Sequence, residues 1–256
     1  MVLVRRWVHH AQLELVPVLV PPGSNVAALL HPPVPALLAR MARDVSESLS
    51  PPQRRRLAVL TFDDGPYPVT TPALIARLRS LGVPADFFLI GDDVITQPAI
   101  AMQAAAAGIE LGNHTLTHPE LVALGPAAQL AEIAGGARAL SRVTGRDPAF
   151  FRPPHGNYEA ATLSAAAQAN ETVALWDIDP GDWRTLTADQ IVASVFKQAR
   201  APAVILFHNG KEATIEALPR IVAEFRRAGF DFVTLSELQR EMAADEINDP
   251  VRVRLP

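Results

Sequence analysis

The sequence has 256 residues and contains no cysteine. Disulfide bonds and catalysis by a cysteine thiolate are therefore excluded, and any transition metal must be bound by histidine, aspartate or glutamate. The sequence also lacks a basic surplus, because its formal net charge is −4. The charge balance therefore gives no indication that the protein binds nucleic acid or an anionic membrane.

Long apolar runs are missing as well. No run approaches the roughly 20 apolar residues that a helix needs to cross a bilayer, so we predict no transmembrane segment. Arg5 and Arg6 lie near the start, but the stretch after them is interrupted by polar residues, and no clear small-residue cleavage site follows. We therefore expect a cytoplasmic protein by default, unless the amino terminus hides an export signal.

The composition is that of a folded chain. Hydrophobic residues make up 49% and charged residues 20% of the sequence, which is typical of globular proteins. Eight prolines preclude long regular elements in the first 52 residues. We predict a proline-rich extension over 1–52 with one short helix at 34–42, a folded domain over 53–240 and a tail over 241–256.

From residue 57 onward, apolar runs typical of buried strands alternate with helical patterns. This alternation predicts a parallel sheet in an α/β fold, and about seven units favour a closed (β/α) barrel over an open sheet. The helix expected over 70–81 has its apolar residues on one stripe and ends at Gly82. Strands are expected over 57–62, 85–90 and 231–235 and ending near His114, Arg152, Asp179 and His208; helices are expected over 70–81, 100–107, 127–143, 158–169, 188–199 and 214–228.

Five short polar motifs follow these apolar runs. In a barrel of parallel strands, the carboxyl ends of the strands converge on one face, where the loops build active sites. Packing alone does not easily explain five polar motifs in that position. The motifs are Thr61-Phe62-Asp63-Asp64-Gly65-Pro66, His114-Thr115-Leu116-Thr117-His118, Arg152-Pro153-Pro154-His155-Gly156, Asp179-Pro180-Gly181-Asp182-Trp183 and Leu206-Phe207-His208.

The first two motifs carry candidate metal ligands. His114 and His118 are four residues apart, which on a helical turn puts both imidazoles on one side. Two histidines and one carboxylate from Asp63-Asp64 leave an open position for water, as in catalytic zinc sites. Because consecutive residues of an extended chain point in opposite directions, one aspartate can bind a metal while the other faces the substrate. A simple turn would explain Gly65 and one aspartate, but not both aspartates.

The other motifs offer groups for proton transfer. Arg152 follows a strand end, and a guanidinium at the edge of a barrel core favours a carboxylate partner. Asp179 and His208 end two further strands. A buried histidine next to a carboxylate has a raised pKa and can act as a general acid, although a single buried histidine is more often structural.

The order and spacing of the five motifs resemble the polysaccharide deacetylase family, also called carbohydrate esterase family 4 or the NodB homology domain. The resemblance covers about residues 57–235 and implies a distorted (β/α) barrel, often with seven strands. It also implies a metal-dependent hydrolase that removes acetyl groups from glycans containing N-acetylglucosamine, such as chitin oligomers or peptidoglycan, and releases acetate. Members of this family are often exported.

The resemblance also implies residue roles. Asp63 would be the general base. The protein would also bind one divalent metal, which is usually zinc, with cobalt or nickel as alternatives. Arg152 would hold and tune Asp63, and Asp179 would tune His208, the general acid. The metal ligands would be Asp64, His114 and His118, and Trp183 and Leu206 would line the pocket for the acetyl group.

The third motif departs from the family pattern, which most often has a tyrosine where this chain has His155. In the family, the backbone N–H at this position helps to hold the oxyanion. A backbone donor survives a change of side chain, so the resemblance keeps that role for His155. The different side chain instead affects the substrate preference.

Other interpretations stay open at this point. The same barrel could serve O-deacetylation of xylan-type glycans or amide hydrolysis of a small metabolite, and the weak export signal favours the small metabolite somewhat. A non-enzymatic glycan-binding protein would lack the base, a ligand or the acid, and none is missing. We therefore expect an acetylated glycan or oligosaccharide as the partner and no nucleic acid.

Overall fold

The computed structural model describes residues 55–248, and of residues 244–248 only the backbone. The predicted extension over 1–52 with its helix at 34–42 lies outside the described residues, as does the end of the predicted tail. None of the helices described within 55–248 combines the length and the apolar character needed to cross a membrane.

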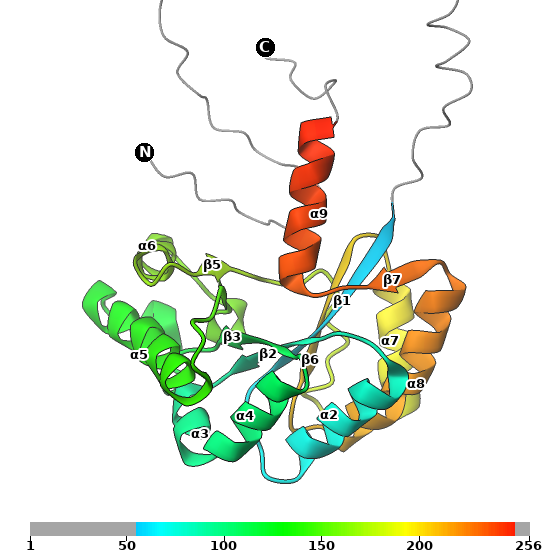
Figure 1. Cartoon of the computed structure of the whole chain (residues 1–256), viewed down its shortest axis with the longest axis horizontal. Coiled ribbons are helices and arrows are strands. Elements are labelled where there is room, and N and C mark those ends of the chain that lie inside the picture. The colour runs from blue at the N-terminus through cyan, green and yellow to red at the C-terminus, as the bar shows by residue number, and fades with distance from the viewer. Residues whose placement is uncertain (1–54, 249–256) are drawn as a thin grey trace, which may run out of the picture. The chain divides into compact units, whose positions relative to one another are not determined.

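Within the described residues, seven parallel strands form one curled sheet (Figure 1). The strand order is β5-β4-β3-β2-β1-β6, and β7 pairs with the first residues of β1. A parallel bridge joins Ile178, which follows β5, to Ile205 in β6, so the two edges of the sheet meet there. The strands are β1 (Arg56–Asp63), β2 (Asp86–Leu89), β3 (Glu110–Asn113), β4 (Phe150–Phe151), β5 (Thr172–Val173), β6 (Ala203–His208) and β7 (Phe230–Phe232). The predicted fold, a distorted (β/α) barrel of about seven parallel strands, is confirmed.

Helices surround the outer side of this sheet (Figure 1). The helix predicted over 70–81 coincides with α2, and Gly82 ends it in the left-handed conformation at φ 59°. The α-helices are α2 (Thr70–Leu81), α3 (Gly91–Thr96), α4 (Pro98–Ala106), α5 (Pro126–Thr144), α6 (Ala160–Gln168), α7 (Ala188–Gln198), α8 (Glu212–Arg227) and α9 (Leu235–Asn248), with short 3₁₀ turns at Leu121–Ala123 and Pro154–Gly156.

Two of these helices were not predicted. α3 has only six residues, too few for an apolar stripe to repeat. α9 begins at Leu235, within the strand predicted over 231–235, so β7 is shorter than expected. α9 also continues to Asn248, across the domain boundary predicted after residue 240.

The alternation of side chains along β1 explains why Asp63, its last residue, points to the inner side of the sheet. Leu60 and Phe62 lie in the core between the sheet and the helices. Val59 lies in a second core, whose buried members come from strands, from the segments that directly follow strands, and from α9. Because side chains alternate with a period of two, Asp63 continues the row of Val59 on the inner side of the sheet. Asp63 is therefore buried, with 4% of its surface exposed.

The amino end of α9 closes the opposite end of the sheet. The backbone N–H of Leu235 donates to Asp86, the first residue of β2, and the N–H of Ser236 donates to Glu110, the first residue of β3. Burial and the adjacent Glu110 carboxylate raise the pKa of Asp86 well above its ordinary value. This shift favours the protonated, neutral form of Asp86.

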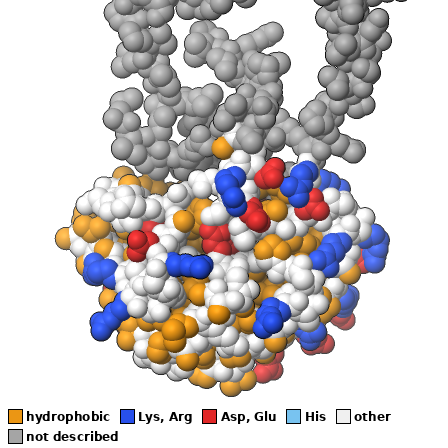
Figure 2. All heavy atoms as spheres, in the orientation of Figure 1, with side chains coloured by type: hydrophobic (Ala, Val, Ile, Leu, Met, Phe, Trp, Pro, Cys, Tyr) orange, Lys and Arg blue, Asp and Glu red, His pale blue; other side chains and the backbone are white. Residues whose placement is uncertain are grey.

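The face of the molecule seen in Figure 1 carries charges of both signs. Figure 2 shows basic and acidic side chains interspersed there, with hydrophobic side chains between them. This face therefore presents no large area of one sign to nucleic acid or an anionic membrane.

Candidate metal and catalytic site

Four strand ends bring the predicted polar residues together. Asp63 ends β1 and lies in register with His208, which ends β6. Asn113 ends β3 and lies in register with Phe151 of β4. Since His114 and Arg152 directly follow these two residues, the four motifs meet at the carboxyl end of the sheet, as the barrel geometry requires.

Asp64, His114 and His118 form the one group within residues 55–248 whose geometry suits a metal ion, with ligand atoms all within 4.8 Å of one another. Oδ1 of Asp64 lies 3.4 Å from Nε2 of His118 and 3.8 Å from Nε2 of His114. Asp64 leaves the strand in a left-handed conformation, at φ 72°, which separates its side chain from that of Asp63. Two imidazole nitrogens and one carboxylate are a donor set that suits zinc and related divalent ions.

The environment of His114 prepares it as a ligand. Its Nδ1–H donates to the carbonyl oxygen of Arg152 over 2.8 Å, which leaves the lone pair of Nε2 facing the carboxylates of Asp63 and Asp64, each 3.8 Å away. Burial lowers the pKa of His114 to about 3, and the Asp64 carboxylate only partly opposes this. The imidazole is therefore neutral, which is the form that binds metals.

The expected helical turn between the two histidines is not present. Residues 114–118 form a loop in which Thr115 and His118 have φ values of 69° and 60°. The loop lies against α5 at Gly136, where a Cβ atom would be 2.2 Å from Oδ1 of Asn113. Close contact with a glycine of α5, and not helical spacing, therefore brings the two imidazoles together.

The buried carboxyl group of Glu171, which was not predicted, holds Asn113 at the start of this loop. Nδ2 of Asn113 donates to Oε2 of Glu171 over 2.9 Å and to the carbonyl oxygen of Ile133. Burial raises the pKa of Glu171 to about 8, so the group is mostly protonated at neutral pH. Glu171 directly precedes the short strand β5 in the sequence, and no local pattern distinguishes it from a surface glutamate.

Asp63 is held by Arg152, as the sequence predicted. Nη1 of Arg152 donates to Oδ1 of Asp63 over 2.7 Å and to the Thr61 hydroxyl over 2.8 Å. The guanidinium is fully buried, lies over the ring of Phe88 and also donates to the carbonyl oxygen of Ala174. Burial raises the pKa of Asp63, and the positive charge of Arg152 opposes that shift. A carboxylate with a raised pKa is a stronger base, which suits proton abstraction.

His208 is paired with Asp182, so the predicted pairing with Asp179 is wrong. Oδ1 of Asp182 accepts from Nδ1 of His208 over 2.7 Å, and Oδ2 accepts from the backbone N–H of His208 and from the Thr214 hydroxyl. The carboxylate of Asp179 instead accepts from the N–H of Gly181 within its own turn. Both aspartates belong to the fourth motif, and only the path of this turn selects Asp182.

The pKa of His208 follows from this pairing. Burial alone lowers it, but the hydrogen bond and the charge of Asp182 outweigh burial, and Asp63 and Asp64 add to the effect. The pKa of His208 is therefore above its ordinary value. A protonated imidazole at this position can donate a proton to a leaving group.

His155 lies beside the histidine pair. Its imidazole packs edge-on against that of His118, with ring centroids 5.0 Å apart. Its backbone is left-handed at φ 60°, a conformation that is uncommon for non-glycine residues but that histidine, like asparagine and aspartate, adopts more often than most. The side chain is exposed, so it faces the open side of the site.

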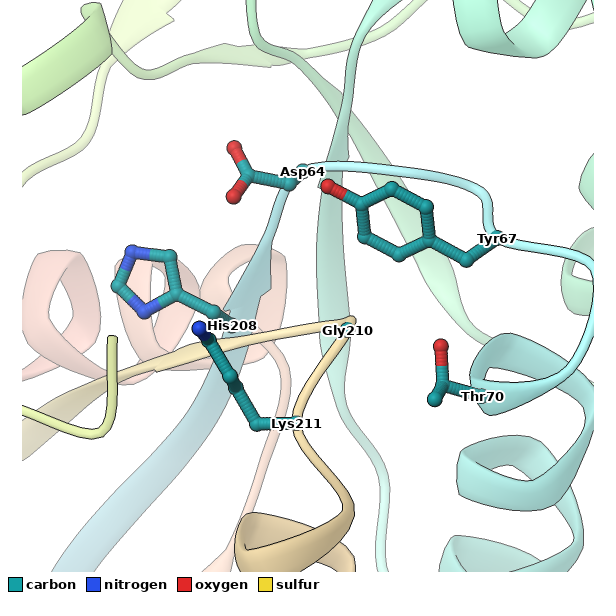
Figure 3. A pocket seen from close by; sticks show the side chains of 6 residues that line it. All are labelled: Asp64, Tyr67, Thr70, His208, Gly210 and Lys211. Carbon is teal, nitrogen blue, oxygen red and sulfur yellow. The ribbon is translucent and has the colours of Figure 1, made fainter. Parts of the chain in front are cut away.

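A cavity of about 230 Å³ opens beside His208 and Asp64 (Figure 3). Tyr67 and Lys211, which were not predicted, line it together with Thr70 and Gly210. Of the two residues predicted to line an acetyl pocket, Leu206 is buried at 4% exposure and Trp183 is 51% exposed. Neither is among the residues that line this cavity.

Comparison with known proteins gives one consistent family. The polysaccharide deacetylase profile matches residues 50–174. A chitooligosaccharide deacetylase from a Bradyrhizobium species is 34% identical, covering 72% of this chain and 90% of the relative. A peptidoglycan-N-acetylglucosamine deacetylase from Bacillus cereus is 35% identical, covering 74% and 91%. The structure of peptidoglycan deacetylase PdaC from Bacillus subtilis superposes with a TM-score of 0.70 at 31% identity, covering 78% of this chain and 96% of that one.

Proposed function

Because the chain belongs to the polysaccharide deacetylase family, we propose that it removes acetyl groups from glycans containing N-acetylglucosamine and releases acetate. The observation that carries the proposal is the separation of two adjacent carboxylates. Oδ1 of Asp64 lies 3.8 Å from His114 and 3.4 Å from His118. Oδ2 of Asp63 also lies 3.8 Å from His114, but the other oxygen of Asp63 is held by Arg152. Asp64 is thus available to bind a metal ion, and Asp63 is available to accept a proton.

We assign the metal site to Asp64, His114 and His118. The donor set and the tautomer that Arg152 imposes on His114 fit one divalent ion, and we propose zinc, with cobalt or nickel as functional substitutes. When bound, such an ion supplies Lewis acidity, which polarises a carbonyl group and makes water more acidic.

The chain's own residues move the protons. Asp63 accepts a proton from the water that attacks the acetyl carbonyl, and Arg152 keeps the carboxylate oriented for this step. His208, protonated and held by Asp182, donates a proton to the departing amine. The C–N bond of the acetamide breaks, and acetate and a free amino sugar are the products.

The remaining predicted residues contribute to binding. The backbone N–H of His155 is proposed to donate to the oxyanion, an interaction worth about 3 kcal/mol in enzymes with this arrangement. The His155 imidazole, Trp183 and Leu206 are proposed to shape the place where the acetylated sugar lies.

The test measures acetate release and metal content together. The purified protein is incubated with N-acetylchitotetraose and with acetylxylan, before and after chelation, and zinc is then added back. We expect acetate from the chitin oligomer, loss of activity on chelation and recovery with zinc. Release from acetylxylan alone would instead favour the O-deacetylase.

A matched pair of variants tests the ligand assignment. His118→Ala should lose bound metal and activity, since a ligand is removed. His155→Ala should keep the metal, although His155 packs against His118. Stoichiometric metal in His118→Ala would contradict the assignment.

A further inference from the structure

The cavity beside the catalytic groups is rich in hydrogen-bond donors. Figure 3 shows Tyr67 and Thr70 on one side of it and His208 and Lys211 on the other. Asp64 is the one acidic residue of the lining, and its carboxylate is already assigned to the metal. The hydroxyls and the ammonium group thus remain available for a ligand that offers acceptors.

Lys211 provides a cation that has no carboxylate partner within residues 55–248. Its Nζ donates to the backbone carbonyl of Trp183 over 3.1 Å, and none of the ion pairs found among these residues includes it. The residue is half-buried and precedes α8, whose amino end has no side-chain cap. The positive end of the helix dipole therefore adds to the charge of the ammonium group, and both favour a bound anion.

The facing wall supplies neutral donors. The Thr70 hydroxyl oxygen is buried and has no hydrogen-bond partner in the described part of the chain, although such groups are usually paired in native proteins. Burial, together with the charges of Asp64 and Asp93, raises the pKa of Tyr67 to about 12. The phenol therefore stays protonated and can donate.

A second cation, Arg184, contacts the same residue as Lys211. The guanidinium of Arg184 lies over the half-exposed ring of Trp183, 4.6 Å from its centre. Arg184 is likewise absent from the ion pairs that the described residues form. Two cations that form no ion pair among the described residues thus adjoin Trp183.

We propose that Lys211, Tyr67 and Thr70 form a subsite for a carboxylate that the glycan carries close to the acetyl group being removed. The inference rests on the proposed deacetylase function and adds to it a preference for acetylated glycans with acidic sugars. A charge-assisted hydrogen bond is roughly twice as strong as a neutral one. A neutral chitin oligomer has no carboxylate that could form such a bond with Lys211.

The experiment changes only the charge of the substrate. Wild type is assayed on a peptide-free glycan strand whose N-acetylmuramic acid carries a lactyl carboxylate, and on the same strand with its carboxyl groups converted to methyl esters. An acetylated oligosaccharide containing a uronic acid tests the second source of a carboxylate. We expect wild-type kcat/KM to be about tenfold higher on the free acid than on the ester, mainly through KM.

Variants then assign the preference to one residue. Lys211→Met should lose the tenfold preference, so that the free acid and the ester react with similar kcat/KM, and Lys211→Arg should retain the preference. The chain has only one other lysine, Lys197, which is exposed on α7. Lys197→Met is therefore a matched control and should behave as wild type. Thermal unfolding of each variant reports whether it is folded.

The two proposals fail in different ways. Equal wild-type rates on acid and ester, or an equal slowing of both in folded Lys211→Met, would overturn the carboxylate subsite and leave the deacetylase function standing. A wild-type protein that is loaded with metal and releases no acetate from any of the glycans would overturn the deacetylase function itself.

Discussion

Both ends of the curled sheet bury acidic side chains, but the two ends neutralise them differently. At the carboxyl end, Asp63 is paired with the guanidinium of Arg152, and Asp64 faces two imidazoles. At the amino end, Asp86 and Glu110 lie against each other and accept backbone N–H groups of α9. The first arrangement keeps negative charge available, whereas the second favours the protonated form of Asp86.

The comparison shows that burial alone does not identify a catalytic carboxylate. Burial raises the pKa of both Asp63 and Asp86. Only Asp63 has a fixed cation as its partner, which favours the ionised form that can accept a proton. Asp86 has a second carboxyl group as its neighbour, which favours the neutral form and suits a helix cap.

The largest expected effect comes from replacing Asp63, the proposed general base at the carboxyl end of the sheet. Asp63→Asn should lower turnover on N-acetylchitotetraose by about 10²–10⁴-fold, since general-base catalysis is commonly worth that much. Metal content, measured on the same preparation, should be unchanged because Asp64 remains. Activity close to wild type would refute the role of Asp63 and remove the distinction between the two ends.

The next largest effect is expected from lowering the pKa of His208, the proposed general acid. Asp182→Asn removes the negative charge that raises the pKa of His208 and leaves at most a neutral amide oxygen to accept from its Nδ1–H. A lower pKa means that His208 loses its proton at lower pH, so the alkaline limb of the pH profile of kcat should move to lower pH. At a fixed pH above the limb, the rate should fall by about tenfold if the pKa of His208 drops by one pH unit.

Asp179→Asn is the matched control for that variant. The carboxylate of Asp179 contacts the N–H of Gly181 and not His208. The limb should therefore stay in place in Asp179→Asn. A limb that shifts in Asp179→Asn but not in Asp182→Asn would restore the pairing expected from the sequence.

A smaller effect is expected at His155. His155→Tyr keeps the backbone N–H and changes only the exposed wall of the site, so deacetylation should continue with a change of a few fold in the ratio of rates on different glycans. The ratio of rates on N-acetylchitotetraose and on a peptidoglycan strand measures this. Loss of bound metal in this variant would instead show that His155 is a further ligand.

The smallest effect on catalysis should come from the amino end. Asp86→Asn copies the neutral carboxyl group and should leave kcat within about twofold of wild type, because the site lies at the other end of the strands. Stability should respond instead. In wild type the folded state keeps the proton of Asp86 that the unfolded chain releases, so stability falls as pH rises above the ordinary pKa of 3.8. Denaturant unfolding across pH should show a weaker fall in Asp86→Asn, and an unchanged slope would contradict a raised pKa for Asp86.

Much of the fold and most of the site could be predicted from short stretches of sequence. The apolar stripe over 70–81 and the stop at Gly82 depend on neighbouring residues only, and both agree with α2. Motif order places Asp63 and Arg152 at the same end of the barrel, and the resemblance to the family implied their partnership, which the structure contains. The six-residue α3 and the start of α9 inside a predicted strand lacked a repeating pattern that could reveal them.

The sequence by itself determined which kinds of side chain gather at the carboxyl end, because five motifs follow five apolar runs. Only the tertiary structure decided which of them touch. Asp179 and Asp182 are equivalent by type, and the left-handed turn at Gly181, with φ 75°, directs Asp182 to His208. Lys211 likewise carries no local signal, and it lines the cavity because β6 and α8 place it there. Such choices depend on backbone paths between distant segments, and a linear pattern does not encode them locally.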